Sequence, residues 1–329
     1  MSKLRYIASR TVQTVFMLWA ILTFLFFLFH FLPGSYTDIM LFEGASPEQV
    51  EAFRARWGLN DPLHVQYFDY IANFVRGDPG ISLRTQEPVW EAVKMPLFNS
   101  VILIAPGITV GYVVGSAIGT LLGTSRNSRF ERLGVIGVVS MGTIPIFFFA
   151  ILLIFLFSGV LGWFPSSGMI SPIKTGQYAD ATWWRIYLTQ DFAWHYFLPF
   201  LTIALRYVNL PTLIMRTSVV EVMNQDFVYY QRITGLSSFK RKLHIARHAS
   251  LPVITVYPIS LARSVGGLVL LELVFNWPGI GLTLVTAVFE RDFPVVQFVF
   301  FLVSTVVVLG NFGVDILYGI IDPRVSLED

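Results

Sequence analysis

Charged residues are scarce in this chain of 329 residues, and cysteine is absent altogether. Asp, Glu, Lys and Arg make up 13% of the sequence, whereas soluble domains carry roughly 25%. Without cysteine, the chain can form neither a disulfide nor a thiolate metal site. Hydrophobic residues reach 54%, and the mean hydropathy is +0.64. This composition predicts an all-α integral membrane protein.

Sequence signatures of catalysis are missing as well. The chain contains no G-x-x-x-x-G-K-[ST], no H-E-x-x-H and no G-x-S-x-G, which argues against a nucleotide-binding domain, a zinc protease and a serine hydrolase. The histidines are scattered, and the one close pair, His244 and His248, falls in a basic stretch where a polar helix face is commoner than a metal site. We expect a non-catalytic chain that binds no metal, no cofactor and no nucleic acid.

Apolar runs long enough to cross a bilayer, which needs about 20 residues, recur along the chain. We expect six spans, at residues 11–32, 97–124, 134–161, 196–215, 253–275 and 295–320. The first resembles an uncleaved signal anchor, because its apolar part is too long for a signal peptide. Pro145 predicts a kink in the third span. Six spans place both termini on one side of the membrane.

Glycines recur at every fourth position of the second expected span. They are Gly107, Gly111, Gly115, Gly119 and Gly123. A row of small residues allows two helices to approach closely in lipid, so we expect this row to serve helix packing.

Basic residues are distributed unevenly between the two sides of the expected membrane domain. The side of the termini carries about 13 Lys and Arg residues. The opposite side carries about 8, although the loops on that side are longer. The termini are therefore predicted to be cytoplasmic, in the plasma (inner) membrane. We expect a cytoplasmic tail and first span at 1–34, an extracytoplasmic segment at 35–96 with helices at 47–57 and 62–75, and a core of five spans at 97–329.

A basic stretch at residues 221–252 lies between the fourth and fifth expected spans, on the cytoplasmic side. A short helix is expected from Asp226, as its N-cap, to Gly235, which would adopt a left-handed conformation. The second half is patterned as another helix, with apolar residues on one stripe at Phe239, Leu243 and Ala246. Such a pair of helices could lie on anionic lipid headgroups or dock onto another protein.

Four charged residues fall within the expected spans, namely Arg206, Arg263, Glu272 and Asp315. Intramembrane charges line a polar path or form pairs that fix helix register. Glu272 and Asp315 lie near span ends, which favours structural pairing, whereas Arg263 is expected in mid-span and is the better candidate for a path.

The C-terminal third resembles one known family in residue order and spacing. The matching residues are Glu272, Phe275, Pro278, Gly279, Ile280, Gly281, Arg291, Asp292, Pro294, Gln297, Asn311, Asp315, Tyr318, Asp322, Pro323 and Arg324. On these residues, and on 30–34 and 58–62 nearer the N-terminus, the chain is similar to the permease subunits of the dipeptide and oligopeptide class of ABC importers. The resemblance implies the six-helix, MetI-like fold of type I ABC importers. It also implies a structural role for Glu272, Pro278, Gly279, Gly281, Asp292, Asp315 and Asp322.

The resemblance also implies a role for residues 221–252, as the coupling (EAA) loop that docks on an ATPase subunit. The residues assigned to it are Asp226, Arg232, Gly235, Leu236, His244, Arg247, Ala249 and Pro252. The implied partners are a second homologous permease, two ABC ATPase subunits that hydrolyse the ATP, and an extracytoplasmic binding protein that delivers peptides.

The translocation path is expected to be lined by Arg263, Ser264, Gly266 and Gly267, together with Arg206. The cargo stays open at this point, since relatives of such permeases import oligosaccharides, nickel or other small solutes. A stand-alone secondary transporter is the alternative from another class. It would need ion-coupling carboxylates near the midplane of two related halves, and the sequence has no internal repeat.

Overall fold

The computed structural model describes residues 3–31, 46–56, 58–172, 183–267 and 269–321. Most of these residues are helical, and the only β-structure among them is an isolated bridge between Ile81 and Pro88. The prediction of an all-α protein is confirmed. The elements are α1 (Lys3–Phe31), α3 (Pro47–Arg56), α4 (Leu63–Val75), α5 (Val89–Thr124), α6 (Arg129–Thr143), α7 (Ile146–Leu153), the π-helix η1 (Ile154–Val160), the 3-10 helix η3 (Trp183–Leu188), α9 (Gln190–Arg206), α10 (Asn209–Val222), α11 (Asp226–Ile233), α12 (Ser238–Ala249), α13 (Leu251–Gly267), α14 (Val269–Phe275), α15 (Ile280–Phe289) and α16 (Phe293–Ile321).

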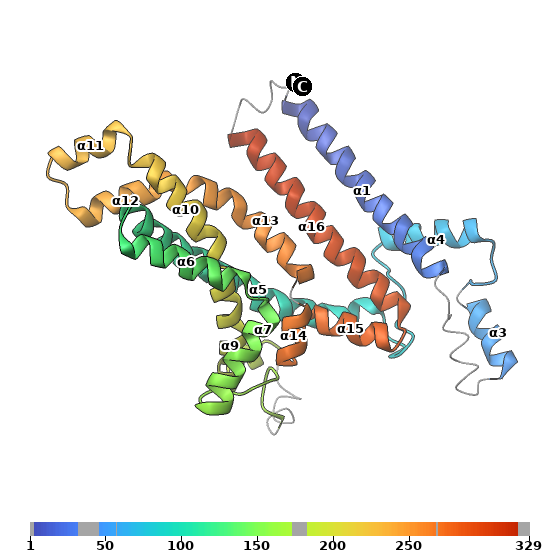
Figure 1. Ribbon diagram of the computed structural model, residues 1–329. Helices are drawn as coiled ribbons and strands as arrows, with labels where there is room; N and C mark the ends of the chain where they lie inside the picture. Colours follow the sequence, from blue (N-terminus) through green and yellow to red (C-terminus); the bar gives the residue numbers. More distant parts are fainter. Residues whose placement is uncertain (1–2, 32–45, 57, 173–182, 268, 322–329) are drawn as a thin grey trace. The chain divides into compact units, whose positions relative to one another are not determined.

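The chain divides into two compact units, one formed by residues 1–98 and 282–329 and the other by residues 99–281. In the first unit, α1 and α16 lie side by side (Figure 1). The short helix α4 packs on α1, where Tyr67 shares a 2.8 Å hydrogen bond with Thr23 and its ring lies edge-on to Phe26. Helices α3 and α4 match the two expected between the first and second spans.

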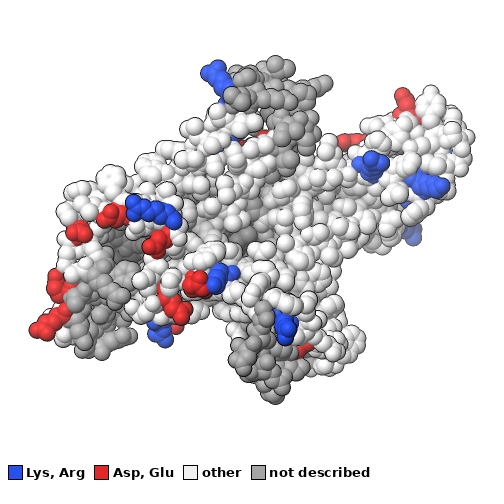
Figure 2. Space-filling model, turned by 180° about the vertical axis from the view of Figure 1, so that it is seen from behind, with Lys and Arg blue, Asp and Glu red and all other residues white. Residues whose placement is uncertain are grey.

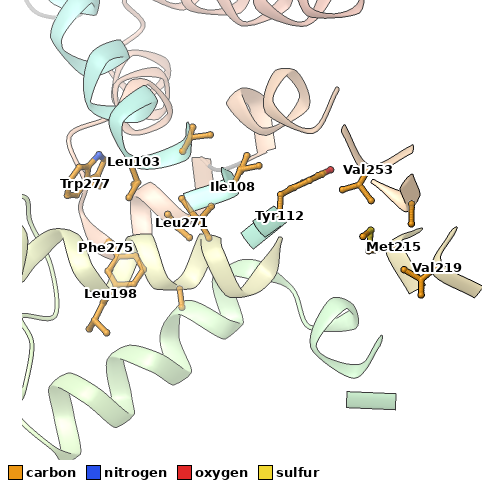
Figure 3. Packing of buried hydrophobic residues seen from close by; sticks show 14 of the residues in the cluster. Leu103, Ile108, Tyr112, Leu198, Met215, Val219, Val253, Leu271, Phe275 and Trp277 are labelled. Carbon is orange, nitrogen blue, oxygen red and sulfur yellow. The ribbon is translucent and has the colours of Figure 1, made fainter. Parts of the chain in front are cut away.

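The core of the second unit joins α5, α9 and α14. Leu103, Leu198 and Leu271 are fully buried in it, and the large rings of Phe275 and Trp277 close one end (Figure 3). Each of these helices therefore has one inward apolar face, while many other apolar side chains are exposed. Charged side chains are sparse over the face shown in Figure 2. This distribution is the one expected of a chain whose solvent is lipid.

The glycine row on α5 packs against α9 and α10, as expected. A Cβ added to Gly111 would lie 2.6 Å from the carbonyl oxygen of Ala204, and one added to Gly119 would lie 2.5 Å from that of Thr212. Real Cβ atoms essentially never approach other atoms so closely. Only glycine allows the two helices to lie at this distance.

Four helices are long and apolar enough to cross a membrane, or up to six if each of two bent pairs forms one span. The first bent pair, α6 with α7 and η1, turns by 101° at Ile144 and Pro145. The kink expected at Pro145 is therefore confirmed, and it follows from the missing proline N–H. The count of six remains a prediction.

Two expectations about the spans and loops are wrong. The second span begins at Val89 instead of residue 97. Residues 280–289, expected as loop, form α15, which is bent by 87° from α14 and begins where the buried side chain of Glu272 binds the backbone. The fifth span, expected at 253–275, is covered by α13 and α14, and residue 268 between them lies outside the described residues. Arg263 lies on α13, and its place in mid-span stays a prediction.

Candidate functional site

Helices α11 and α12 form a hairpin at one end of the second unit (Figure 1). Gly235 adopts φ +75°, and its N–H binds the carbonyl of Arg232 while the N–H of Leu236 binds that of Gln231. These two bonds form a Schellman motif, which ends α11 at a left-handed glycine. The expected sequence of helix, glycine turn and helix is confirmed. The N-cap is Gln225, however, and Asp226 is the first helical residue, so that detail of the expectation is wrong.

Inward side chains hold the hairpin against the rest of the second unit. Val228 of α11 and Ile245 and Ala249 of α12 are buried, and α12 packs against α10 and α13. Between the two helices, Gln231 Nε2 lies 3.2 Å from His244 Nδ1. The hairpin is thus a packed structure and not a solvated loop.

The hairpin also exposes a set of large apolar side chains. Phe239 and Leu243 of α12 are 77% and 60% exposed, and on α11 the exposed residues are Tyr229, Tyr230 and Ile233. Ala246, the third member of the expected stripe, instead packs against the core. Basic side chains gather at the same end of the unit (Figure 2). Clusters of exposed apolar residues edged by charge are typical of interaction surfaces.

Polar contacts fix α6 along α10, the helix that leads into the hairpin. Ser128 caps α6 by accepting the N–H of Glu131 at 3.0 Å, and the Glu131 carboxylate accepts the Asn127 N–H at 2.6 Å. The Nε of Arg216 donates to the same carboxylate at 2.8 Å. At the other end of the pair, Asn209 Nδ2 donates to the carbonyl of Val138 at 2.7 Å.

Glu272 is 2% exposed and lies in a closed polar site of the second unit. Its carboxylate accepts the hydroxyl of Ser100 at 2.6 Å and the N–H of Gly281 at 2.7 Å. The N–H of Ile280 donates to the same serine oxygen at 2.8 Å. The carboxylate therefore caps the N-terminus of α15, where negative charge is stabilised. A Cβ on Gly279 would overlap this carboxylate, so only glycine fits there.

Asn99 completes the connection between α5 and the turn before α15. The Nδ2 of Asn99 donates to the carbonyl of Pro278 at 2.8 Å, and its Oδ1 accepts from the Tyr187 hydroxyl at 2.6 Å. The backbone carbonyl of Asn99 accepts from the indole N–H of Trp277 at 3.1 Å. Burial raises the pKa of the Tyr187 hydroxyl, which therefore stays a donor at neutral pH. These contacts surround the Pro278–Gly281 segment.

The remaining motif residues belong to the first unit. Asp292, buried at the start of α16, accepts the Ser82 hydroxyl and the N–H of Leu83 at 3.1 Å. Asp315 lies 3.5 Å from Arg10 of α1. Asp322 lies outside the described residues.

The residues expected to line a path are placed only in part. The side chain of Arg263 and the surroundings of Gly266 and Gly267 lie outside what the structure describes. Ser264 is buried, donates to the carbonyl of Leu261 at 2.7 Å, and interacts with the hydroxyl of Tyr207, which is in electrostatic range of Arg206. The structure thus brings Ser264 close to Tyr207, the residue that follows Arg206.

Sequence reasoning missed the hydroxyl groups around that place. Tyr112 and Ser260 hydrogen-bond through their hydroxyls at 2.5 Å, and Thr109 and Tyr257 at 2.6 Å. The rings of the two tyrosines meet edge to face, 5.2 Å apart. We call these four residues, with Tyr207 and Ser264, the hydroxyl seam. Its members come from α5, α13 and the junction of α9 and α10.

Comparison with known proteins identifies the family. Residues 107–327 match the family described as "Binding-protein-dependent transport system inner membrane component", and residues 3–101 match the N-terminal family of the same membrane components. The chain is 34% identical to a putative peptide permease protein of Brucella ovis, over 98% of this chain and 99% of the relative. It is 34% identical to the di/tripeptide transport system permease protein DppB of Pseudomonas aeruginosa, over 98% of each, and 31% identical to the glutathione transport system permease protein GsiC of Escherichia coli, over 99% and 100%. The resemblance found in the sequence is confirmed: the chain belongs to the inner-membrane permeases of binding-protein-dependent ABC transport systems.

Proposed function

We propose that this permease forms, with a second homologous permease, the membrane path of an ATP-driven importer for short peptides. The names of the similar proteins support a peptide cargo. Two ATPase subunits would hydrolyse ATP, and an external binding protein would deliver the peptide. Both termini of this chain would be cytoplasmic, on the side of the α11–α12 hairpin.

The observation that carries the proposal is the exposed apolar surface of that hairpin. Phe239 and Leu243 are mostly exposed, whereas Ile245 and Ala249 on the same helix are buried. A packed hairpin can transmit a displacement to α10 and α13 because it contacts both. Closure of the ATPase pair on ATP would move the hairpin, and the path would alternate between outward-facing and inward-facing states.

The test is co-purification of the tagged permease from its native membrane, followed by ATPase and uptake assays. We expect two ATPase chains and a second permease in the complex, and uptake sensitive to vanadate. Phe239→Ala with Leu243→Ala should release the ATPase. Phe289→Ala, at a phenylalanine of α15 that is 83% exposed, is the matched control and should leave the complex intact. A permease that purifies alone and still transports, insensitive to vanadate, would instead be a secondary transporter.

A further inference from the structure

Arg206 is a cation within an apolar helical segment. It ends α9, halfway along the apolar helical segment Gln190–Val222, and it is partly buried. It forms no hydrogen bond or ion pair with any residue that the structure describes. A cation in this position is costly unless it faces another helix, a cavity or a ligand, so its placement calls for an anionic partner.

The position of Arg206 along its segment argues against lipid phosphate as that partner. About 16 residues separate it from each end of the segment, or about 24 Å at the helical rise of 1.5 Å per residue. A segment centred in a hydrocarbon core about 30 Å thick would place this guanidinium near the middle, far from either headgroup layer. An anion that reaches it must enter along a path through the protein.

The hydroxyl seam begins at Tyr207, the residue that follows Arg206 in the chain. Gly111 packs directly against the Tyr207 backbone and Cβ, which brings Tyr207 next to Tyr112, the neighbour of Gly111. Tyr112 contacts both Ser260, through its hydroxyl, and the ring of Tyr257, whose own hydroxyl bonds the exposed hydroxyl of Thr109. Each hydroxyl can donate and accept, and in this structure the hydroxyls bond to one another and, from Thr109 and Ser264, to backbone carbonyls.

We infer that Arg206 and the hydroxyl seam form a binding site for the peptide in transit. The guanidinium would hold the C-terminal carboxylate, which matches its planar donors in two parallel hydrogen bonds. Hydroxyls that donate and accept equally would exchange their mutual bonds for bonds to peptide N–H and C=O groups. Such a site recognises what all short peptides share and ignores their side chains. The inference rests on the proposed function.

The test uses the complete reconstituted importer and a dipeptide with a free carboxylate and a diazirine side chain. Light-induced labelling is measured by mass spectrometry after the complex is trapped with vanadate. We expect labels on α5, on the α9–α10 junction and on α13 near seam residues. Arg206→Gln should lower labelling and uptake at least tenfold, and Arg206→Lys should retain part of both. Arg185→Gln, which removes an exposed cation elsewhere in the same unit, should change neither.

The outcomes separate this inference from the proposed function. If wild-type uptake is vanadate-sensitive but Arg206→Gln transports normally, or if the labels fall elsewhere, the site is wrong and the importer stands. Crosslinks from cysteines placed at the seam to a carboxylate-bearing helix of the second permease, independent of peptide, would make Arg206 a structural partner and overturn the inference. If Arg206→Gln does not assemble, Tyr257→Phe decides, since loss of its hydroxyl should lower labelling while the complex stays intact. Absence of ATP-dependent uptake in the wild type would refute the importer itself.

Discussion

The guanidinium of Arg216 is bound to the carboxylate of Glu131, which also caps the start of α6. Glu131 is buried, and Arg216 is about one-third exposed. We expect Glu131→Gln to destabilise the folded permease by about 1–3 kcal/mol, because it leaves a partly buried guanidinium without its charged acceptor. The melting temperature of the purified permease measures this loss.

The double variant Glu131→Gln with Arg216→Met is the control for this pair. Removal of both charges should cost less than the sum of the two single changes, because neither partner is left unpaired. Purely additive effects would show that the two residues contribute independently. Peptide-stimulated ATPase activity should fall in parallel with stability, since α10 leads into the α11–α12 hairpin.

Gly119→Ala should destabilise the packing of α5 on α10. Its new Cβ would lie 2.5 Å from a backbone oxygen, which cannot move as a flexible side chain could. We expect a cost of about 1–3 kcal/mol, typical of an overpacked contact, and a lower yield of folded protein. Gly137→Ala on α6 is the matched control, because no atom lies within 4 Å of its added Cβ. Equal melting temperatures for the two variants would contradict the close packing.

Gly235 tests the turn of the hairpin separately from its contacts. No atom lies within 4 Å of a Cβ at this position, so a substitution acts only through the backbone at φ +75°. Gly235→Val should cost about 1–2 kcal/mol and weaken ATPase coupling, whereas Gly235→Asn should be tolerated, because asparagine adopts left-handed conformations readily. ATPase stimulation by peptide-loaded binding protein measures the difference. A valine variant as active as the asparagine variant would count against a fixed turn.

Glu272→Gln should destabilise the start of α15. An amide offers one oxygen where the carboxylate accepts both the Ser100 hydroxyl and the Gly281 N–H, so one donor is left poorly satisfied in a buried site. We expect a cost of about 1–3 kcal/mol. Limited proteolysis at 276–279 should be faster in this variant than in the wild type. Ser100→Ala should show the same direction of change, and unaltered proteolysis in both would refute the capping role.

Local signals in the sequence predicted local features of the structure. The φ of Gly235, the close contacts of the glycine row and the bend at Pro145 each follow from the chemistry of one residue type. Helix α15 was missed because its start depends on Glu272, whose capping contact crosses a turn. The cap of α6 carried a recognisable signal, since Ser128 and Glu131 have the spacing of a capping box.

The hydroxyl seam had no comparable signal in the sequence. Tyr112 and Ser260 are 148 positions apart and lie in apolar runs where single hydroxyls are unremarkable. Their relationship exists only once α5 packs on α13. Arg206 was recognisable as an intramembrane charge, but only the folded chain could show that it pairs with none of the described residues.

The glycine row also determines how α5 can move. The glycines from Gly107 to Gly123 contact successive residues of α9 and then α10, over about 24 Å of helix. A screw shift by one residue, about 1.5 Å along and about 100° around the helix axis, would bring larger side chains to the positions of the glycines, namely Pro106, Val110, Val114, Ile118 and Leu122. Those positions do not accommodate even a Cβ, so this small shift between α5 and α10 is sterically blocked. In an alternating-access cycle we therefore expect the two helices to travel together and the displacement to occur at other interfaces.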